Sequence, residues 1–168
     1  MTERSVIHDT FTIERSYPAT PSRVFAAFAT EEAKSSWGET EELEPADADP
    51  VADADAGTTE FDFRVGGRER FSVKNDGSNF RYDALYYDIV PDQRIVYSYE
   101  MYADDMRISV SVATIEFAKS GDGTQLIWTE QGTYLDGIDG AEAPELRKGG
   151  TMEMLDGLLT YLQSRATA

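Results

Sequence analysis

Two glutamates and a group of tyrosines are the residues of this sequence whose types and positions could do chemistry. Glu69 and Glu130 each share the alternation of the apolar residues around them, which predicts that both carboxylates face the inside of a sheet. Burial raises the pKa of a carboxylic acid, and an acid that titrates near neutrality can act as a general acid or base. Both residues lie near predicted strand ends, where water or an arginine can compensate the charge. We therefore expect no catalytic role for either.

Other catalytic sets are missing from the composition. The chain has no cysteine and one histidine, His8, which excludes thiolate nucleophiles, disulfides, cysteine zinc sites and multi-histidine metal sites. His8 precedes the centre of the first predicted strand, so no serine–histidine–aspartate set is available. Residues 147–151 contain two glycines, but no glycine stands upstream of them where a phosphate-binding loop needs one. We expect no metal site and no cofactor.

The charge of the chain limits its partners. There are 15 basic and 32 acidic residues in 168, which gives a net charge of −17. Such a chain is repelled by phosphate backbones and by anionic membrane surfaces, so nucleic-acid and membrane binding are not expected. No stretch approaches the roughly 20 apolar residues that a membrane span needs. The amino terminus lacks the pattern of a signal peptide, which predicts a cytoplasmic protein.

Hydrophobic periodicity divides the chain into four parts. Residues 7–17 alternate as a strand, and residues 21–28 and 30–38 form two short helices. Residues 39–56 hold eight acids (Glu39, Glu41, Glu42, Glu44, Asp47, Asp49, Asp53, Asp55) and no base, which indicates a solvated acidic loop insertion. This insertion is expected to contribute little to the core.

The second half of the chain alternates with a period of two and then changes to a helical period. Six strands follow from Gly57 to Gln131, and the first of them extends to Val65. A shift in the apolar alternation between Val112 and Ile115 predicts a β-bulge. Residues 144–164 carry a broad apolar stripe and form a long helix.

This order predicts an α+β protein. Strand, two short helices, six strands and a long helix give one curved antiparallel sheet of about seven strands, wrapped around the carboxy-terminal helix. The length fits a single domain over residues 1–168.

Several blocks in this order resemble the START and birch-pollen-allergen (SRPBCC) superfamily. The most similar branch is that of bacterial proteins like the carboxy-terminal domain of the Hsp90 ATPase activator. The blocks that carry the resemblance are residues 18–28, Trp37-Gly38, Gly66-Gly67, residues 84–91, residues 94–97, residues 123–126, residues 130–132, and Gly150 followed by Leu155, Leu158 and Leu162. The resemblance implies the helix-grip fold, in which a sheet and a long helix enclose a cavity.

The resemblance further implies that the interior binds a small hydrophobic or aromatic molecule, such as a lipid or a polyketide. Buried tyrosines need hydrogen-bond partners, which a partly polar cavity supplies more easily than a dry core. The residues expected to line the site are Trp37, Phe63, Phe71, Tyr82, Tyr86, Tyr97, Tyr99, Met101, Trp128 and Glu130.

Three functions remain open on the sequence. The first is a non-enzymatic carrier or sensor, and the second is an enzyme of the polyketide cyclase or aromatase type. The third is a chaperone-interacting module, as the branch name suggests. The lack of a clear acid–base set favours binding over catalysis. The sequence leaves a homodimer open.

Overall fold

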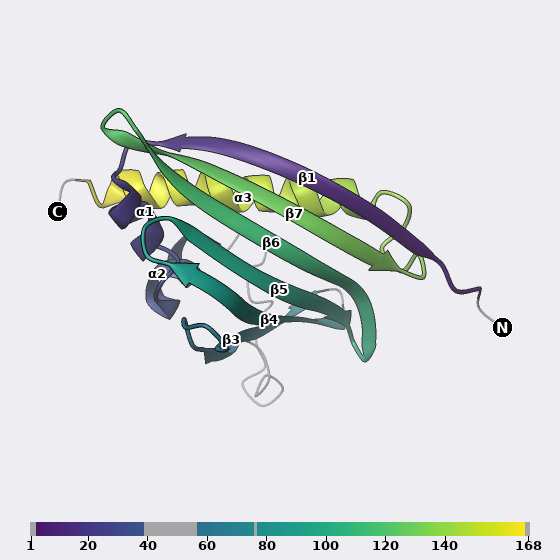
Figure 1. Cartoon of the computed structure of the whole chain (residues 1–168). Helices are drawn as coiled ribbons and strands as arrows, with labels where there is room; N and C mark the ends of the chain where they lie inside the picture. Colours follow the sequence, from purple (N-terminus) through teal and green to yellow (C-terminus); the bar gives the residue numbers. More distant parts are fainter. Residues whose placement is uncertain (1–2, 39–56, 76, 167–168) are drawn as a thin grey trace.

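The computed structural model describes residues 3–38, 57–75 and 77–166, and these form one antiparallel sheet with three helices (Figure 1). The sheet has seven strands in the order β1-β7-β6-β5-β4-β3-β2. Their bounds are β1 Val6–Tyr17, β2 Gly57–Phe61, β3 Arg68–Asn75, β4 Ser78–Val90, β5 Arg94–Ala103, β6 Met106–Ser120 and β7 Gly123–Leu135. β1 pairs with β7, the last strand, although the two are far apart in sequence. Every other pair of neighbouring strands is consecutive in the sequence.

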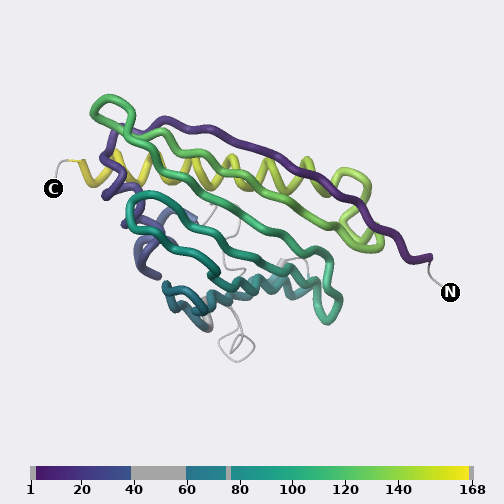
Figure 2. The backbone as a smooth tube through the Cα atoms, viewed as in Figure 1, coloured from purple at the N-terminus to yellow at the C-terminus, as the bar shows by residue number. Residues whose placement is uncertain are grey.

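The helices pack on the concave side of this sheet. Two short helices, α1 (Pro21–Ala26) and α2 (Glu31–Gly38), follow β1, and the long helix α3 (Ala143–Ser164) ends the fold. Figures 1 and 2 show α3 running along β1 and β7, with α1 and α2 near its carboxy-terminal end. This arrangement confirms the predicted helix-grip fold. None of the described helices is long and apolar enough to cross a membrane.

The start of α1 has a clear local cause. Thr20 has an extended backbone and its Oγ1 accepts a hydrogen bond from Arg23 N (3.3 Å), while Pro21 needs no amide partner in the first turn. The helix ends at Ala26, two residues before the predicted end.

The predicted bulge between Val112 and Ile115 is wrong. The pairing of β6 with β7 is continuous from Ser109 to Ser120, and the irregularity in β6 lies at Ile108 instead. The strand therefore buries Ser109 and Ser111 and turns Val110 and Val112 outward, where they are 37% and 40% exposed. The prediction failed because it assumed that the buried positions of this strand are apolar, whereas Ser109 and Ser111 face a polar partner inside the protein, described below.

The strand predicted to reach Val65 is shorter than expected. It ends at Phe61, since Asp62 N donates to Arg68 O (2.8 Å) and the chain turns toward β3. A Cβ at Gly67 would lie 2.1 Å from Asp62 O, so this tight turn requires glycine. Val65 is 56% exposed as a result. The predicted acidic insertion at residues 39–56 lies outside the described residues.

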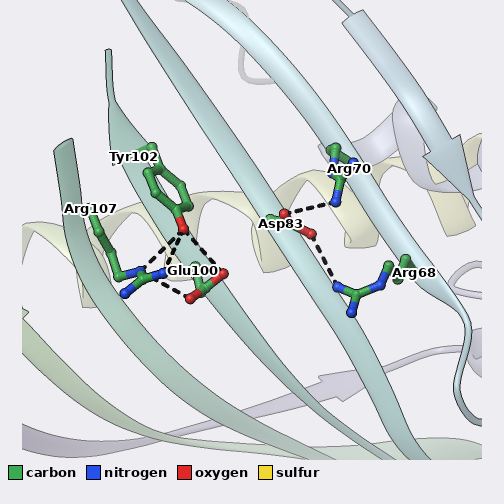
Figure 3. Close-up of polar contacts among 6 residues, drawn as sticks. All are labelled: Arg68, Arg70, Asp83, Glu100, Tyr102 and Arg107. Atoms are coloured by element: carbon green, nitrogen blue, oxygen red, sulfur yellow. Dashed lines mark hydrogen bonds and ion pairs between the residues drawn. The ribbon is translucent and has the colours of Figure 1, made fainter. Parts of the chain in front are cut away.

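Several charged residues lie on the convex face of β3–β6. Figure 3 shows them on the side away from α3: Asp83 lies between Arg68 and Arg70, and Arg107 contacts Glu100 and Tyr102. The Arg70–Asp83 and Arg107–Glu100 separations are both 3.0 Å. These pairs lie across neighbouring strands. Arg107 and Glu100 are 48% and 35% exposed, so that pair contributes little to stability, whereas Asp83 is only 11% exposed between its two arginines.

The contact between α2 and α3 depends on a glycine. A Cβ at Gly157 would lie 2.7 Å from the carbonyl oxygen of Trp37. Any larger residue would push the two helices apart, because the contacting atom belongs to backbone. This close approach holds α2 over the concave side of the sheet, where its side chains reach the site described next.

Candidate functional site

The concave side of the sheet is unevenly covered by helices. The long helix packs against β1 and β7, and α1 packs against β6 and β7. The concave side of β3, β4 and β5 presents six large side chains, which we call the concave aromatic face: Phe71, Tyr82, Tyr86, Tyr97, Tyr99 and Met101. Three of them (Tyr86, Tyr97 and Tyr99) are buried, whereas Phe71, Tyr82 and Met101 are only partly buried although they point inward.

The rings of the concave aromatic face touch one another in sequence. Phe71 stacks on Tyr82 with centroids 4.8 Å apart, and Tyr82 lies 5.0 Å from Tyr99. Tyr97 lies 6.0 Å from Tyr99 and 5.8 Å from Tyr86. Alternation along three paired strands produces this surface, because cross-strand partners on one face come close enough for ring contacts.

One buried ion pair borders this face at its α2 end, and we call it the Glu69 cluster (Lys34, Glu69 and Tyr86). Lys34 Nζ contacts Glu69 Oε2, and the Tyr86 hydroxyl donates to the same oxygen (2.8 Å). Lys34 Nζ also lies 5.7 Å from the centre of the Tyr97 ring, within range of a cation–π interaction. Burial, and next the charge of Glu69, raises the pKa of Tyr86, so this phenol stays protonated.

A second buried ion pair borders the face on the α3 side, and we call it the Glu130 cluster (Glu130, Arg147, Tyr99 and Trp128). The Tyr99 hydroxyl donates to Glu130 Oε1, and Trp128 Nε1 donates to Glu130 Oε2 (3.2 Å). Arg147 Nη1 lies 3.8 Å from Glu130 Oε1 and donates to the Tyr99 oxygen (2.8 Å). Burial raises the pKa of Glu130, and the Tyr99 hydrogen bond and the charge of Arg147 oppose this rise.

The inward serines of β6 complete the Glu130 cluster. Arg147 Nη2 donates to Ser109 Oγ (2.9 Å) and Nη1 to Ser111 Oγ (3.4 Å). The guanidinium therefore has partners on β5, β6 and β7, and the Arg147 side chain is only 15% exposed. This explains why β6 buries serines and exposes valines: the buried cation of α3 needs hydroxyl acceptors.

The two clusters limit what chemistry the site can perform. In each, one glutamate is matched by one cation and by a tyrosine hydroxyl that also accepts from that cation. A general acid or base must exchange a proton with a substrate, and both Glu130 oxygens are already occupied. The arrangement suits fixed recognition of a ligand better than proton transfer. No group of acids and histidines among the described residues is placed to hold a metal ion.

The structure places two of the predicted site residues outside the concave aromatic face. Trp37 is buried at the end of α2, where its Nε1 donates to Ala27 O (2.8 Å) and its ring packs edge-on to Phe28. Phe63 lies in the turn after β2 and contacts Phe25 and Tyr86. Trp128 and Glu130 lie on β7, on the same side of the sheet and beside the concave aromatic face, and the other six predicted residues form it.

Four residues of the two clusters were not predicted from the sequence: Lys34, Ser109, Ser111 and Arg147. A signal existed for Arg147, because it precedes Thr151, Leu155, Leu158 and Leu162 by whole helical turns and so belongs to the buried stripe of α3. Lys34 follows the buried Ala33 on α2 and carries no comparable pattern.

Two hollows of the described surface lie away from this site. One is lined by Arg4, Val6 and Asp136 near the start of β1, and the other by His8, Val110 and Gln131 on the convex face. Neither contains a cluster of charged or aromatic side chains comparable to the concave face.

Comparison with known proteins gives relatives along nearly the whole chain. The family model described as "Activator of Hsp90 ATPase homolog 1-like protein" matches residues 18–163. The solved structure of protein Mll3558 from Rhizobium loti is 43% identical, with a TM-score of 0.78, and the match covers 94% of this chain and 99% of that one. A protein from Rhizobium leguminosarum is 40% identical (TM-score 0.83), with 98% and 100% covered.

A third solved structure is more distant, and curated sequences give no match. Protein CV1439 from Chromobacterium violaceum is 26% identical with a TM-score of 0.67, and the match covers 90% of this chain and 94% of that one. No curated protein matches the sequence significantly.

Proposed function

This chain belongs to the family of Activator of Hsp90 ATPase homolog 1-like proteins, as its sequence blocks predicted, and from that premise we propose that it binds a small aromatic or hydrophobic molecule on the concave aromatic face. In this proposal the protein is a non-enzymatic carrier or sensor. Family membership fixes ancestry and fold, whereas the activity has to be argued from the site itself.

The observation that carries the proposal is the partial exposure of inward-facing apolar side chains. Phe71, Tyr82 and Met101 point to the concave side, where a sheet normally buries its residues against another layer. Contiguous apolar surface that stays open to solvent marks a binding site more often than a structural accident. A flat ligand on this surface would extend over β3–β5 the layer that α3 provides mainly over β1 and β7.

The alternatives have less support from the geometry. A cyclase-like enzyme needs a free acid or base facing the substrate, and both glutamates are held by a cation and a tyrosine. The chaperone-interacting module rests on the family name alone.

Titration with the neutral, polarity-sensitive dye Nile red tests the proposal. We expect saturable binding at micromolar concentrations, seen as dye emission and as quenching of the two tryptophans. Met101→Ala removes apolar contact from the face and should weaken binding by about fivefold to tenfold. Met106→Ala is the matched control, since Met106 is 55% exposed beyond the end of the face. Absence of saturation, or equal losses in the two variants, would contradict the proposal.

A further inference from the structure

Two tyrosines of the concave aromatic face differ from their neighbours in hydrogen bonding. The hydroxyls of Tyr86 and Tyr99 each donate to a glutamate. No hydrogen bond joins the hydroxyl of Tyr82 or Tyr97 to any other described residue. Tyr97 is 4% exposed and Tyr82 is half-buried, so neither hydroxyl lies in bulk solvent.

Neither residue is completely enclosed. Tyr82 is only partly buried, and Tyr97 keeps 4% of its surface exposed. A small molecule on the concave aromatic face can therefore contact both residues. A half-buried hydroxyl without a protein partner gains most from a ligand that supplies one.

The charges around these hydroxyls determine which kind of partner fits. Burial, followed by the charge of Glu130, raises the pKa of Tyr97, and burial and the neighbouring Tyr97 phenol raise that of Tyr82. Both phenols stay protonated and can donate to an acceptor oxygen. The two flanking clusters each pair one glutamate with one cation, so they leave no net charge to compensate an ionic ligand.

The surroundings also limit the shape of the ligand. Tyr82 is stacked on Phe71 with ring planes 20° apart, and Tyr97 packs edge-on to Trp128. The partly buried rings of Phe71 and Tyr82 offer flat surface to a ligand, which favours a planar aromatic molecule over a flexible acyl chain.

We propose that the concave aromatic face selects a neutral, planar aromatic ligand that carries a carbonyl oxygen, with the hydroxyls of Tyr82 and Tyr97 as the donors to that oxygen. This inference rests on the proposed function, since it names the ligand class of the same site. The two tyrosines are specificity-determining residues and the flanking ion pairs position the rings around them.

A pair of probes of equal shape tests the inference. 2-Acetylnaphthalene and 2-isopropenylnaphthalene differ in one position, where the first has a carbonyl oxygen and the second a methylene group. Equilibrium dialysis should show that the ketone binds the wild-type protein about fivefold to tenfold more tightly, the value of one or two ligand hydrogen bonds. The anion 2-naphthoate should bind at least about tenfold more weakly than the ketone, because its charge would be desolvated without a counter-ion.

Variants assign the preference to the two hydroxyls. The double variant Tyr82→Phe/Tyr97→Phe should bind both naphthalenes equally while keeping the wild-type affinity for the isopropenyl probe. It removes no hydrogen bond within the described protein, so it should fold normally. Tyr87→Phe is the matched control on the same strand, with a side chain 57% exposed, and should keep the preference.

The possible outcomes separate this inference from the function beneath it. Equal affinities of ketone and hydrocarbon for the wild type, tighter binding of the anion, or a preference that survives the double variant would overturn the ligand class while leaving the site in place. Failure of all three probes to bind would overturn the site itself, and the ligand class with it.

Discussion

Replacing Arg147 with methionine is expected to destabilise the protein by about 3–5 kcal/mol at neutral pH. The substitution leaves Glu130, whose side chain is 1% exposed, charged and without its cation. It also removes donors to Tyr99, Ser109 and Ser111. Urea denaturation gives the change in the free energy of unfolding. On the convex face, Arg107→Met removes the partner of Glu100 where both side chains are part-exposed, and should cost far less stability than Arg147→Met.

The loss caused by Arg147→Met should depend on pH and on Glu130. Without the arginine, the pKa of Glu130 rises further in the folded state, since the charge of Arg147 lowers it in the wild type. The folded variant then binds a proton that the unfolded chain has lost, so its stability falls as pH rises from the ordinary carboxyl range to that raised pKa. The deficit should be smaller at pH 5 than at pH 8. Adding Glu130→Gln should restore at least half of it. Equal deficits at both pH values, with no recovery in the double variant, would show that Arg147 acts through packing alone.

Replacing Trp128 with alanine is expected to cost about 3–5 kcal/mol of stability. The indole is 3% exposed, packs edge-on to Tyr97 at 6.3 Å, and donates to Glu130. Its removal leaves a cavity beside Tyr97 and takes a donor from a buried carboxylate. Thermal and urea unfolding, followed by circular dichroism, measure the loss.

A second substitution separates the two contributions of Trp128. Trp128→Phe keeps much of the apolar volume but loses the N–H, so its cost should be about 1–2 kcal/mol. A loss below 1 kcal/mol for the alanine variant would mean that the indole borders open space instead of core, and would assign Trp128 to the ligand surface directly.

Strand identity and facing could be predicted from the sequence because alternation is a local property. Tyr97, Tyr99, Trp128 and Glu130 all face inward as their spacing predicts, and the pairing order follows from the short hairpins between them. The predicted bulge failed because periodicity assumes that buried positions are apolar. In β6 the buried positions include Ser109 and Ser111, which serve a cation from a distant helix.

The candidate site was predictable only in its apolar part. The rings of the concave face come from three adjacent strands, and alternation alone places them together. The cations that pair with Glu69 and Glu130 come from α2 and α3. Lys34 is 35 residues away from Glu69 in the sequence. Their distance in sequence carries no information on contact, so an inward glutamate could be recognised while its cation could not. For the same reason, the sequence could not show that the hydroxyls of Tyr86 and Tyr99 have hydrogen-bond partners while those of Tyr82 and Tyr97 have none among the described residues.

Methyl NMR of selectively labelled methionines tests the central claim most directly, because the chain carries its own inner and outer probes. Met101 and Met154 pack against the core from the concave side, whereas Met106 and Met152 are 55% and 38% exposed. Titration with 2-acetylnaphthalene should shift the Met101 methyl strongly through the ring current of the bound molecule and leave the Met106 and Met152 methyls unchanged. Shifts confined to Met106 or Met152, or no saturable shift at Met101, would contradict a ligand site on the concave aromatic face.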